Sequence, residues 1–145
     1  MNVKLKVKRL TDTAKIPTYA HDGDACFDIY SDGLKEMGGV TMVHSTGLKF
    51  DIPKGYAMMI YSRSGMAFKN DVRLANCVGV VDSGFVGEVM VKLTSDSGCL
   101  GVLEYNRGDR IAQAMLIPVP VVEFEEVDYV EYTERGDGGF GSSGK

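Results

Sequence analysis

Residues 76–93 read NCVGVVDSGFVGEVMVKL, two apolar arms on either side of a turn that carries a carboxylate. In the second arm Val89, Val91 and Leu93 recur at every second position, which places them on one face of an extended chain. Between the arms, Asp82-Ser83-Gly84 has the composition of a tight turn. The stretch therefore predicts a β-hairpin with Asp82 at its tip, in a protein built from short antiparallel strands.

The same alternation recurs in residues 3–7, 48–52 and 122–125, and clusters of Gly, Asp, Asn and Pro separate the runs. Such spacing predicts an antiparallel sandwich or barrel of half-buried strands. Proline cannot donate to a central ladder, so the segment with Pro118 and Pro120 is expected at a sheet edge or crossing to another chain.

One short helix is expected within residues 63–74, with Ser62 or Ser64 as its N-terminal cap. The sequence YSRSGM (61–66) sets Arg63 and two hydroxyls where a strand ends and this helix begins. Amide N–H groups and a favourable dipole can bind an anion at such a place. An exposed arginine beside a capping serine explains the same residues about as well.

The chain has 145 residues and a formal net charge of −4, with a pI near 5.1. That length suits one domain, and the charge argues against a nucleic-acid backbone as partner. No apolar run approaches the roughly 20 residues of a membrane span, and the start MNVKLKVKRL lacks a secretory signal, so a cytoplasmic location is expected. Three cysteines (Cys26, Cys77 and Cys99) and two histidines fit neither a disulfide framework nor a zinc site.

The last eleven residues, RGDGGFGSSGK (135–145), include five glycines and cannot bury a core of their own. Such a tail is expected to stay mobile until a ligand orders it. It offers Phe140 as a flat surface for a base, Arg135 as a fork for phosphate, and backbone N–H groups from Gly141 to Ser143. This combination suggests a nucleotide, and a disordered linker is the alternative.

Two polar side chains stand within apolar runs. Asp28 is bracketed by apolar neighbours, a setting that requires a partner, a cation or a water-filled cavity unless the residue lies on an exposed rim. Gln113 follows a charged turn and enters an apolar strand, where its amide either serves a site or faces solvent. Neither residue defines a site alone.

Five segments, in this order, resemble the five motifs of the homotrimeric dUTP diphosphatases (dUTPases): DACFDIYS (24–31), SRSG (62–65), NCVGVVDSGFVGE (76–88), RGDRIAQ (107–113) and RGDGGFGSSG (135–144). The resemblance implies an all-β jelly-roll, or distorted β-barrel, in a homotrimer whose three active sites lie between subunits. It also implies a division into a jelly-roll domain (1–126) and a flexible C-terminal arm with a glycine-rich lid (127–145).

The reaction that the resemblance implies is dUTP + H2O → dUMP + pyrophosphate, with Mg²⁺ on the triphosphate. Asp82 matches the family aspartate that orients and deprotonates the water attacking the α-phosphorus, and that contacts the deoxyribose 3′-OH. Phe85 stands where the family has a tyrosine that packs under the deoxyribose and excludes a 2′-OH, so the ring is kept and its hydroxyl is lost. Main-chain groups from Asn76 to Val81 would read the polar edge of uracil.

Phosphate binding in this resemblance begins with the second motif, where Arg63 and Ser64 match the phosphate-binding pair and Gly65 is a further substrate-binding residue. The Ser64 hydroxyl and nearby amides would lie on the α–β bridge. Asp28 and Gln113 match residues that hold the phosphate chain and the waters of the Mg²⁺ ion, so they serve the metal from its outer shell. Neither a nucleic-acid nor a membrane partner is implied.

The tail supplies the remaining contacts that the resemblance implies. Arg135 would clamp the γ-phosphate, and Phe140 would stack on uracil. Gly141 and Ser142 would wrap the phosphates and, with the rest of the tail, exclude bulk water.

Two other functions stay open. A dCTP deaminase, or a bifunctional relative on the same fold, would use a different acid–base set, and the full segment around Asp82 argues against it. A regulatory member that binds nucleotide and controls a protein partner is the second, and intact Asp82, Arg63, Gln113 and Phe140 favour catalysis over binding alone.

Overall fold

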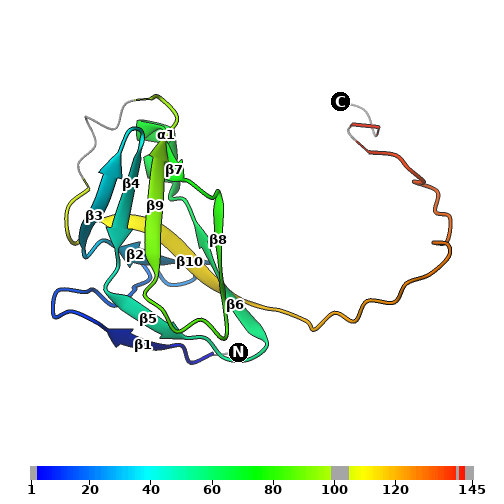
Figure 1. Ribbon diagram of the computed structural model, residues 1–145, viewed down its shortest axis with the longest axis horizontal. Helices are drawn as coiled ribbons and strands as arrows, with labels where there is room; N and C mark the ends of the chain where they lie inside the picture. The colour runs from blue at the N-terminus through cyan, green and yellow to red at the C-terminus, as the bar shows by residue number, and fades with distance from the viewer. Residues whose placement is uncertain (1–2, 99–104, 140, 143–145) are drawn as a thin grey trace.

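Ten short strands and one helix make up the computed structural model, which describes residues 3–98, 105–139, 141 and 142 (Figure 1). The elements are, in chain order, β1 (Lys6–Arg9), β2 (Phe27–Tyr30), β3 (Gly33–Gly38), β4 (Thr41–Ser45), β5 (Leu48–Asp51), β6 (Tyr56–Tyr61), α1 (Ser64–Asn70), β7 (Val72–Leu74), β8 (Val78–Asp82), β9 (Met90–Ser95) and β10 (Arg110–Pro118). The predicted all-β architecture and its one short helix are confirmed. Across the described ranges, no helix is long and apolar enough to cross a membrane.

The strands form a two-stranded ribbon, β1-β5, and two four-stranded antiparallel sheets in the orders β2-β10-β6-β8 and β3-β4-β9-β7. The two larger sheets share one core as a jelly-roll body, and α1 lies at one end of it (Figure 1). In the first sheet β6 is paired on both sides, with Ala57 opposite Asp82 of β8 and Tyr61 opposite Gln113 of β10. This register fixes where two predicted site residues lie relative to each other.

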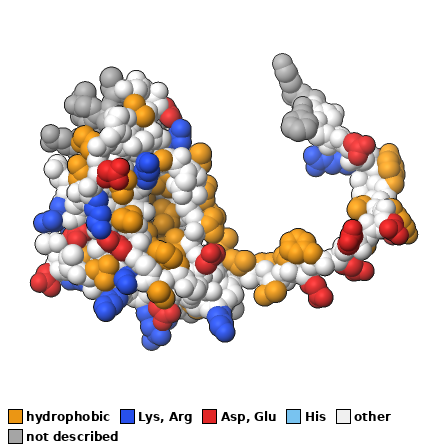
Figure 2. Space-filling view, in the orientation of Figure 1, with side chains coloured by type: hydrophobic (Ala, Val, Ile, Leu, Met, Phe, Trp, Pro, Cys, Tyr) orange, Lys and Arg blue, Asp and Glu red, His pale blue; other side chains and the backbone are white. Residues whose placement is uncertain are grey.

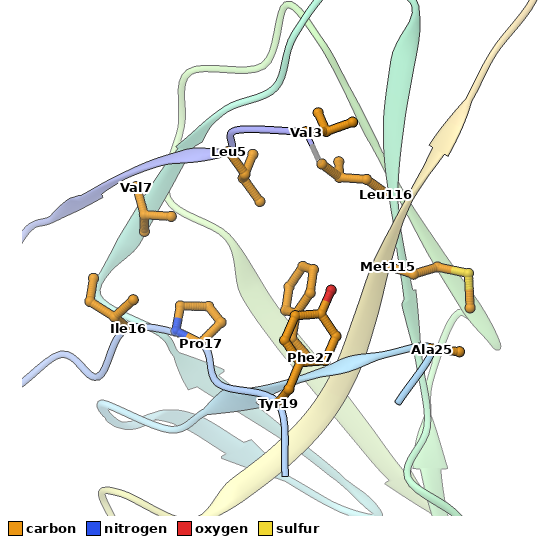
Figure 3. A pocket seen from close by; sticks show the side chains of 10 residues that line it. All are labelled: Val3, Leu5, Val7, Ile16, Pro17, Tyr19, Ala25, Phe27, Met115 and Leu116. Atoms are coloured by element: carbon orange, nitrogen blue, oxygen red, sulfur yellow. The ribbon is translucent and has the colours of Figure 1, made fainter. Parts of the chain in front are cut away.

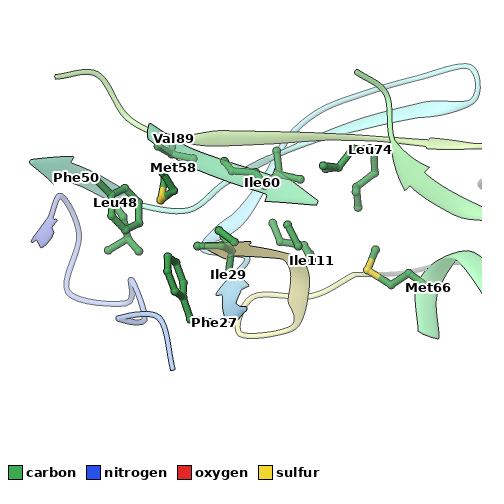
Figure 4. Packing of buried hydrophobic residues seen from close by; sticks show 14 of the residues in the cluster. Phe27, Ile29, Leu48, Phe50, Met58, Ile60, Met66, Leu74, Val89 and Ile111 are labelled. Atoms are coloured by element: carbon green, nitrogen blue, oxygen red, sulfur yellow. The ribbon is translucent and has the colours of Figure 1, made fainter. Parts of the chain in front are cut away.

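Apolar side chains from both sheets meet in this core (Figure 4). Ile29 and Ile111 come from one sheet and Met42 and Leu93 from the other, and all four are fully buried. Because alternate residues of a strand point to the same face, each strand supplies its inward side chains at every second position. Burial stabilises such a core by about 25 cal/mol per Å² of apolar surface, which keeps the strands that carry the polar residues in fixed positions.

His44 is a titratable side chain that lies fully inside the body. Its Nδ1 lies 2.8 Å from Ser31 Oγ, and its Nε2 lies 3.2 Å from Met42 Sδ. The ring meets that of Tyr105 edge-on, with centroids 6.3 Å apart. Burial lowers the pKa of His44 below its ordinary value of 6.5, against a smaller opposing effect of Asp109. The fold therefore favours the neutral imidazole.

The predicted β-hairpin in residues 76–93 is wrong. β8 pairs with β6, and after the turn that follows Asp82 the chain crosses to the other sheet, where β9 pairs with β4 and β7. Apolar alternation indicates which face of a strand is buried but not which strand lies beside it. Asp82 thus lies at the end of an edge strand, where the chain passes from one sheet to the other.

The helix is where the sequence placed it, but its predicted cap is wrong. Arg63 occupies the N-cap position and makes no capping hydrogen bond through its side chain. Ser62 Oγ instead accepts a hydrogen bond from the Leu74 N–H at 2.9 Å, which ties the start of α1 to β7. This long-range bond competes with local capping and could not be read from the local sequence.

The C-terminal segment leaves the body after β10 and runs to Gly139 without helix or strand, with turns over residues 134–137 (Figures 1 and 2). β10 lies between β2 and β6 only as far as Ala114, and from there to Pro118 it pairs with β6 alone, so Pro118 has a neighbouring strand on one side only, as expected for a proline at a sheet edge. The alternative that this segment crosses to another chain stays a prediction. Residues 122–125 form no strand in this chain, and Phe124 is 92% exposed. The apolar alternation in residues 122–125 therefore does not correspond to a half-buried strand within this chain.

Candidate active site

A polar pocket of about 370 Å³ opens where β2, β10 and the β6–α1 junction meet. It is lined by Ala20, His21, Asp24, Ala25, Cys26, Asp28, Arg63, Ser64, Arg110 and Gln113. Four of these residues were predicted from three separate segments of the sequence: Asp28, Arg63, Ser64 and Gln113. The fold brings them together because β10 lies between β2 and β6, and α1 follows β6 almost directly.

Asp28 lies between two guanidinium groups in this pocket. Its Oδ1 accepts a hydrogen bond from Arg63 Nε at 3.0 Å, and its Oδ2 accepts one from Arg110 Nη1 at 3.3 Å. The side chain of Asp28 is 11% exposed and that of Arg110 is 47% exposed, so the carboxylate is enclosed while the cations reach solvent. The carboxylate holds both arginines in place, and their outward N–H groups can bind an anion.

Gln113 and the start of α1 form the neighbouring wall. Gln113 Nε2 donates to the Ser62 carbonyl at 2.9 Å, which links β10 to the residue before the helix cap. Ser64 and Gly65 are the first two residues of α1, and Gly65 lies beside the pocket without lining it. The predicted phosphate-binding residues are therefore adjacent, with Gly65 at the margin.

A second pocket, of about 330 Å³, runs along β8. It is lined by Ile60, Asn76, Gly79, Val80, Val81, Asp82, Phe85, Glu88, Val89 and Met90. Asn76, Val81, Asp82 and Phe85 are the predicted site residues among them. Asp82 is exposed, Phe85 is 45% exposed, and the Phe85 N–H donates to the Asp82 carbonyl at 3.1 Å. We call this the β8 pocket.

The two pockets are separate within one chain, and no residue lines both. Asp82 pairs opposite Ala57 and Gln113 opposite Tyr61, four positions further along β6. Four residues of extended chain span about 13 Å, and the two partners also lie on opposite sides of β6. Within a single subunit, the exposed Asp82 carboxylate therefore lies apart from the two arginines of the polar pocket.

A cavity larger than these two pockets contains none of the predicted site residues (Figure 3). It measures about 500 Å³ and is lined by Val3, Leu5, Val7, Ile16, Pro17, Tyr19, Ala25, Phe27, Met115 and Leu116. No Asp, Glu, Lys, Arg or His lines it, so it lacks the convergent polar groups that fix a substrate in an active site. Size alone does not locate the chemistry in this molecule.

The predicted tail residues that the structure describes, Arg135, Gly141 and Ser142, lie away from both pockets. Arg135 Nε donates to the Gly138 carbonyl at 2.9 Å, so this guanidinium contacts the tail itself. Gly141 and Ser142 are exposed, and Figure 2 shows open space between the C-terminal segment and the body. Phe140 lies outside the described residues. One chain by itself does not bring the tail to either pocket.

In the part of the chain that the structure describes, no three His, Cys, Asp or Glu side chains lie so that they could hold an ion together. The side-chain oxygen donors of the polar pocket come from Asp24, Asp28, Ser64 and Gln113, and two arginines already bind Asp28. Mg²⁺ prefers oxygen ligands and retains several waters. This donor set fits contact with a hydrated Mg²⁺ from its outer shell and does not fit a dedicated cage.

Sequence reasoning missed Arg110. It begins β10, and its guanidinium bridges to Asp28 on the neighbouring strand. The sequence signal was a cation directly before an apolar strand, but the pairing of β10 with β2 that brings Arg110 to Asp28 is a property of the fold.

Glu88 was also missed, and it fastens the end of the loop that follows Asp82 to the opposite sheet. Its Oε1 accepts hydrogen bonds from Ser45 Oγ and from the Gly47 N–H, the latter at 3.0 Å, and its Oε2 lies 3.2 Å from Lys35 Nζ. Burial alone would raise the pKa of Glu88, but these three partners outweigh burial and lower the pKa below its ordinary value of 4.5. The charged carboxylate thus fixes the position of the loop.

The family model for dUTPase matches residues 12–144 of this chain. A deoxyuridine 5'-triphosphate nucleotidohydrolase from Nautilia profundicola is 41% identical over 145 residues, which cover 99% of this chain and 100% of that protein.

Two solved phage proteins share the fold. A G164S mutant of the dUTPase of Staphylococcus bacteriophage 80alpha, solved with dUpNHpp, matches with a TM-score of 0.85 at 27% identity, covering 99% of this chain and 100% of the other. The dUTPase of phage phi11 of S. aureus, whose structure describes a structural Mg(II) ion, matches with a TM-score of 0.77 at 23% identity, covering 90% and 100%. The jelly-roll prediction is confirmed by these matches.

Proposed function

This chain belongs to the dUTPase family, and we infer from its two pockets how it carries out the family's reaction, the hydrolysis of dUTP to dUMP and pyrophosphate. The names of its relatives favour a diphosphatase over the dCTP deaminase alternative. One observation carries the proposal: Asp28, Arg63, Ser64 and Gln113, which come from three separate motifs, line one polar pocket.

Asp82 is the proposed general base. It is exposed at the end of β8 and lies in the same pocket as Phe85, so its carboxylate can meet a water molecule beside a bound nucleotide. The water attacks the α-phosphorus while Asp82 accepts a proton from it. The bond from the α-phosphorus to the α–β bridging oxygen breaks, and pyrophosphate leaves with that oxygen. Attack and departure in line require positioning more than covalent help from the protein.

The β8 pocket is proposed to bind the nucleoside. β8 is an edge strand, and one row of its backbone N–H and C=O groups faces away from the sheet. Such groups between Asn76 and Val81 can pair with the polar edge of uracil as a neighbouring strand would. The Phe85 ring would pack under the deoxyribose and leave no room for a 2′-OH. Phe85 lacks the hydroxyl of the family tyrosine, but this steric role needs only the ring.

The polar pocket is proposed to bind the triphosphate. Arg63, Ser64 and Gly65 would hold the α–β bridge, and Arg63 is already oriented by Asp28. Gln113 and Asp28 would hold the phosphate chain and the waters of a Mg²⁺ ion carried by the substrate. The ion supplies charge neutralisation on the leaving pyrophosphate when it is bound.

A homotrimer with shared sites is the proposed assembly. Its support is the separation of the two pockets along β6, together with the exposed apolar side chains of the C-terminal segment, such as Val121 and Phe124. We propose that residues 1–126 form the jelly-roll domain and that residues 127–145 form the arm and lid. Residues 119–126 would then be covered by neighbouring subunits.

The lid is proposed to close over bound dUTP. Arg135 would clamp the γ-phosphate, Phe140 would stack on uracil, and Gly141 and Ser142 would wrap the phosphates. The support is chemical: a glycine-rich backbone can follow an irregular ligand surface, and Gly141 and Ser142 are exposed. The cytoplasmic location expected from the sequence stays a prediction.

Pyrophosphate release tests the proposed function. Purified protein is assayed with dUTP, dCTP, dTTP and UTP, each with Mg²⁺. Release from dUTP far above the other three is expected, with dUMP as the second product. Equal rates with dCTP, or uracil nucleotides formed from dCTP, would favour the deaminase alternative. Binding without turnover would favour a regulatory role.

A further inference from the structure

Gly87 lies directly against the ring of Phe85. A Cβ atom built on Gly87 would lie 2.5 Å from Phe85 Cζ, 3.0 Å from Cε2 and 3.3 Å from Cε1. Ordinary contacts of a Cβ atom begin at 3.4 Å, so the outer edge of the ring would have to move by about 1 Å to admit a methyl group. The ring occupies its present place because residue 87 has no side chain.

The backbone on both sides of this contact is fixed. On the N-terminal side, the Phe85 N–H donates to the Asp82 carbonyl at 3.1 Å. On the C-terminal side, the Glu88 carboxylate accepts a hydrogen bond from the Gly47 N–H, and the backbone Val89 N–H donates to the Leu48 carbonyl at 3.0 Å. A side chain at residue 87 would therefore displace the flexible ring and leave the anchored backbone in place.

We propose that Gly87 is a positioning residue that sets the place of the Phe85 ring and, through it, the discrimination between deoxyribose and ribose nucleotides. The inference rests on the proposed function, in which this ring packs under the sugar. Phe85 lines the same pocket as Asp82, so a shift of its outer edge changes the space available beside the reacting phosphate ester.

The physical reason is steric. A hydroxyl group is excluded from a pocket only where the wall stands at contact distance, and a wall displaced by an ångström no longer excludes it. Phe85 reaches its position through two rotatable bonds, so the side chain does not fix the ring by itself. The position of the ring is set by the space that Gly87 leaves free and by the anchored backbone of the loop.

The test measures kcat/KM for dUTP and for UTP in Gly87→Ala. The dUTP/UTP ratio is expected to fall by about tenfold or more, because the displaced ring admits the 2′-OH. Gly84→Ala is the matched control from the same loop, since a Cβ there meets nothing within 4 Å. In a Phe85→Ala background, adding Gly87→Ala should change the ratio by less than about twofold, since no ring remains to be displaced.

An unchanged ratio in Gly87→Ala would overturn the inference, and so would an equal fall in Gly84→Ala. A further fall on top of Phe85→Ala would show that Gly87 acts other than through the ring. Failure of Gly87→Ala to fold would also contradict the inference, because it would mean that the backbone gives way and not the ring. If the unmodified protein shows no preference for dUTP over UTP, the proposed function itself fails.

Discussion

Asp82 and Gln113 flank the same strand, β6, at positions four residues apart and on opposite sides of it. Asp82 lines the β8 pocket, which is proposed to bind the nucleoside. Gln113 lines the polar pocket, beside the two arginines that bind Asp28. A triphosphate that reached both groups within one subunit would have to pass across the sheet. A complete site is more simply formed when the β8 pocket of one subunit meets the polar pocket of another.

Asp82→Asn should lower kcat for dUTP by about 10³-fold, since the amide cannot accept the proton of the attacking water. Pyrophosphate release measures the effect, and binding of a non-hydrolysable dUTP analogue should change much less. Asp12→Asn, an exposed carboxylate in the N-terminal loop, is the control and should keep normal turnover. Near-normal kcat in Asp82→Asn would show that another group is the base.

Mixed trimers should recover activity from two inactive parents. Asp82→Asn and a truncation ending at Glu134 are purified separately, then unfolded and refolded together in equal amounts. If each site takes Asp82 and the tail from different chains, about a quarter of the sites receive both intact elements. Should the mixture stay inactive while size measurements confirm mixed trimers, both elements act within one chain.

Removal of residues 135–145 should leave the thermal transition almost unchanged, because no described residue of this tail is buried or belongs to the core. It should depress kcat far more than it weakens dUMP binding, since the tail contacts the triphosphate and the transition state. Phe140→Trp would introduce the first tryptophan of the chain. Its fluorescence should change when a non-hydrolysable dUTP analogue binds, and no change at saturation with intact activity would count against stacking.

Asp28→Asn should weaken both stability and substrate binding. Its enclosed carboxylate accepts hydrogen bonds from two arginines, and such charged bonds contribute about 1.5–3 kcal/mol each to stability. Asp96→Asn is a matched control, because its bond to Arg73 is exposed and should matter little. Denaturant unfolding and KM for dUTP measure the two effects. Equal stability losses in both variants would refute the structural role given to the enclosed pair.

His44 should make the protein less stable in mild acid. Its folded-state pKa is lowered by burial, so the stabilising neutral form is fully present above the unfolded value of 6.5 and is lost as pH falls below it. The melting temperature of the unmodified protein should therefore drop between about pH 7 and pH 5. His44→Gln should be less stable at neutral pH and show a smaller drop. His21→Gln, at a side chain that is 83% exposed, should keep the full drop.

Strand content and the single helix were predictable because the period of the apolar side chains is local information. The partners of each strand were not predictable in the same way. The segment around Asp82 has the composition of a hairpin, yet its two arms belong to different sheets. A serine beside a helix start looks like a cap, yet Ser62 bonds to Leu74 of a later strand.

The polar pocket illustrates the same limit at the level of chemistry. Asp28, Arg63 and Gln113 were predicted because their motifs resemble those of a known family. Arg110 was missed, although it stands three residues from Gln113, because its role depends on the pairing of β10 with β2. Glu88 was missed for the same reason, since its partners Ser45 and Gly47 are more than forty residues away in the chain.

The division of the site between the two flanks of β6 has a genetic consequence. Under the proposed assembly, each site needs one intact β8 pocket and one intact polar pocket, so a subunit with a single defect spoils one site and leaves its neighbours working. A cell that makes normal and Asp82-defective chains together would lose activity only in proportion to the defective share. Such an allele would therefore be recessive, without a dominant-negative effect on the assembly. Two alleles with defects on opposite flanks of β6 would complement each other.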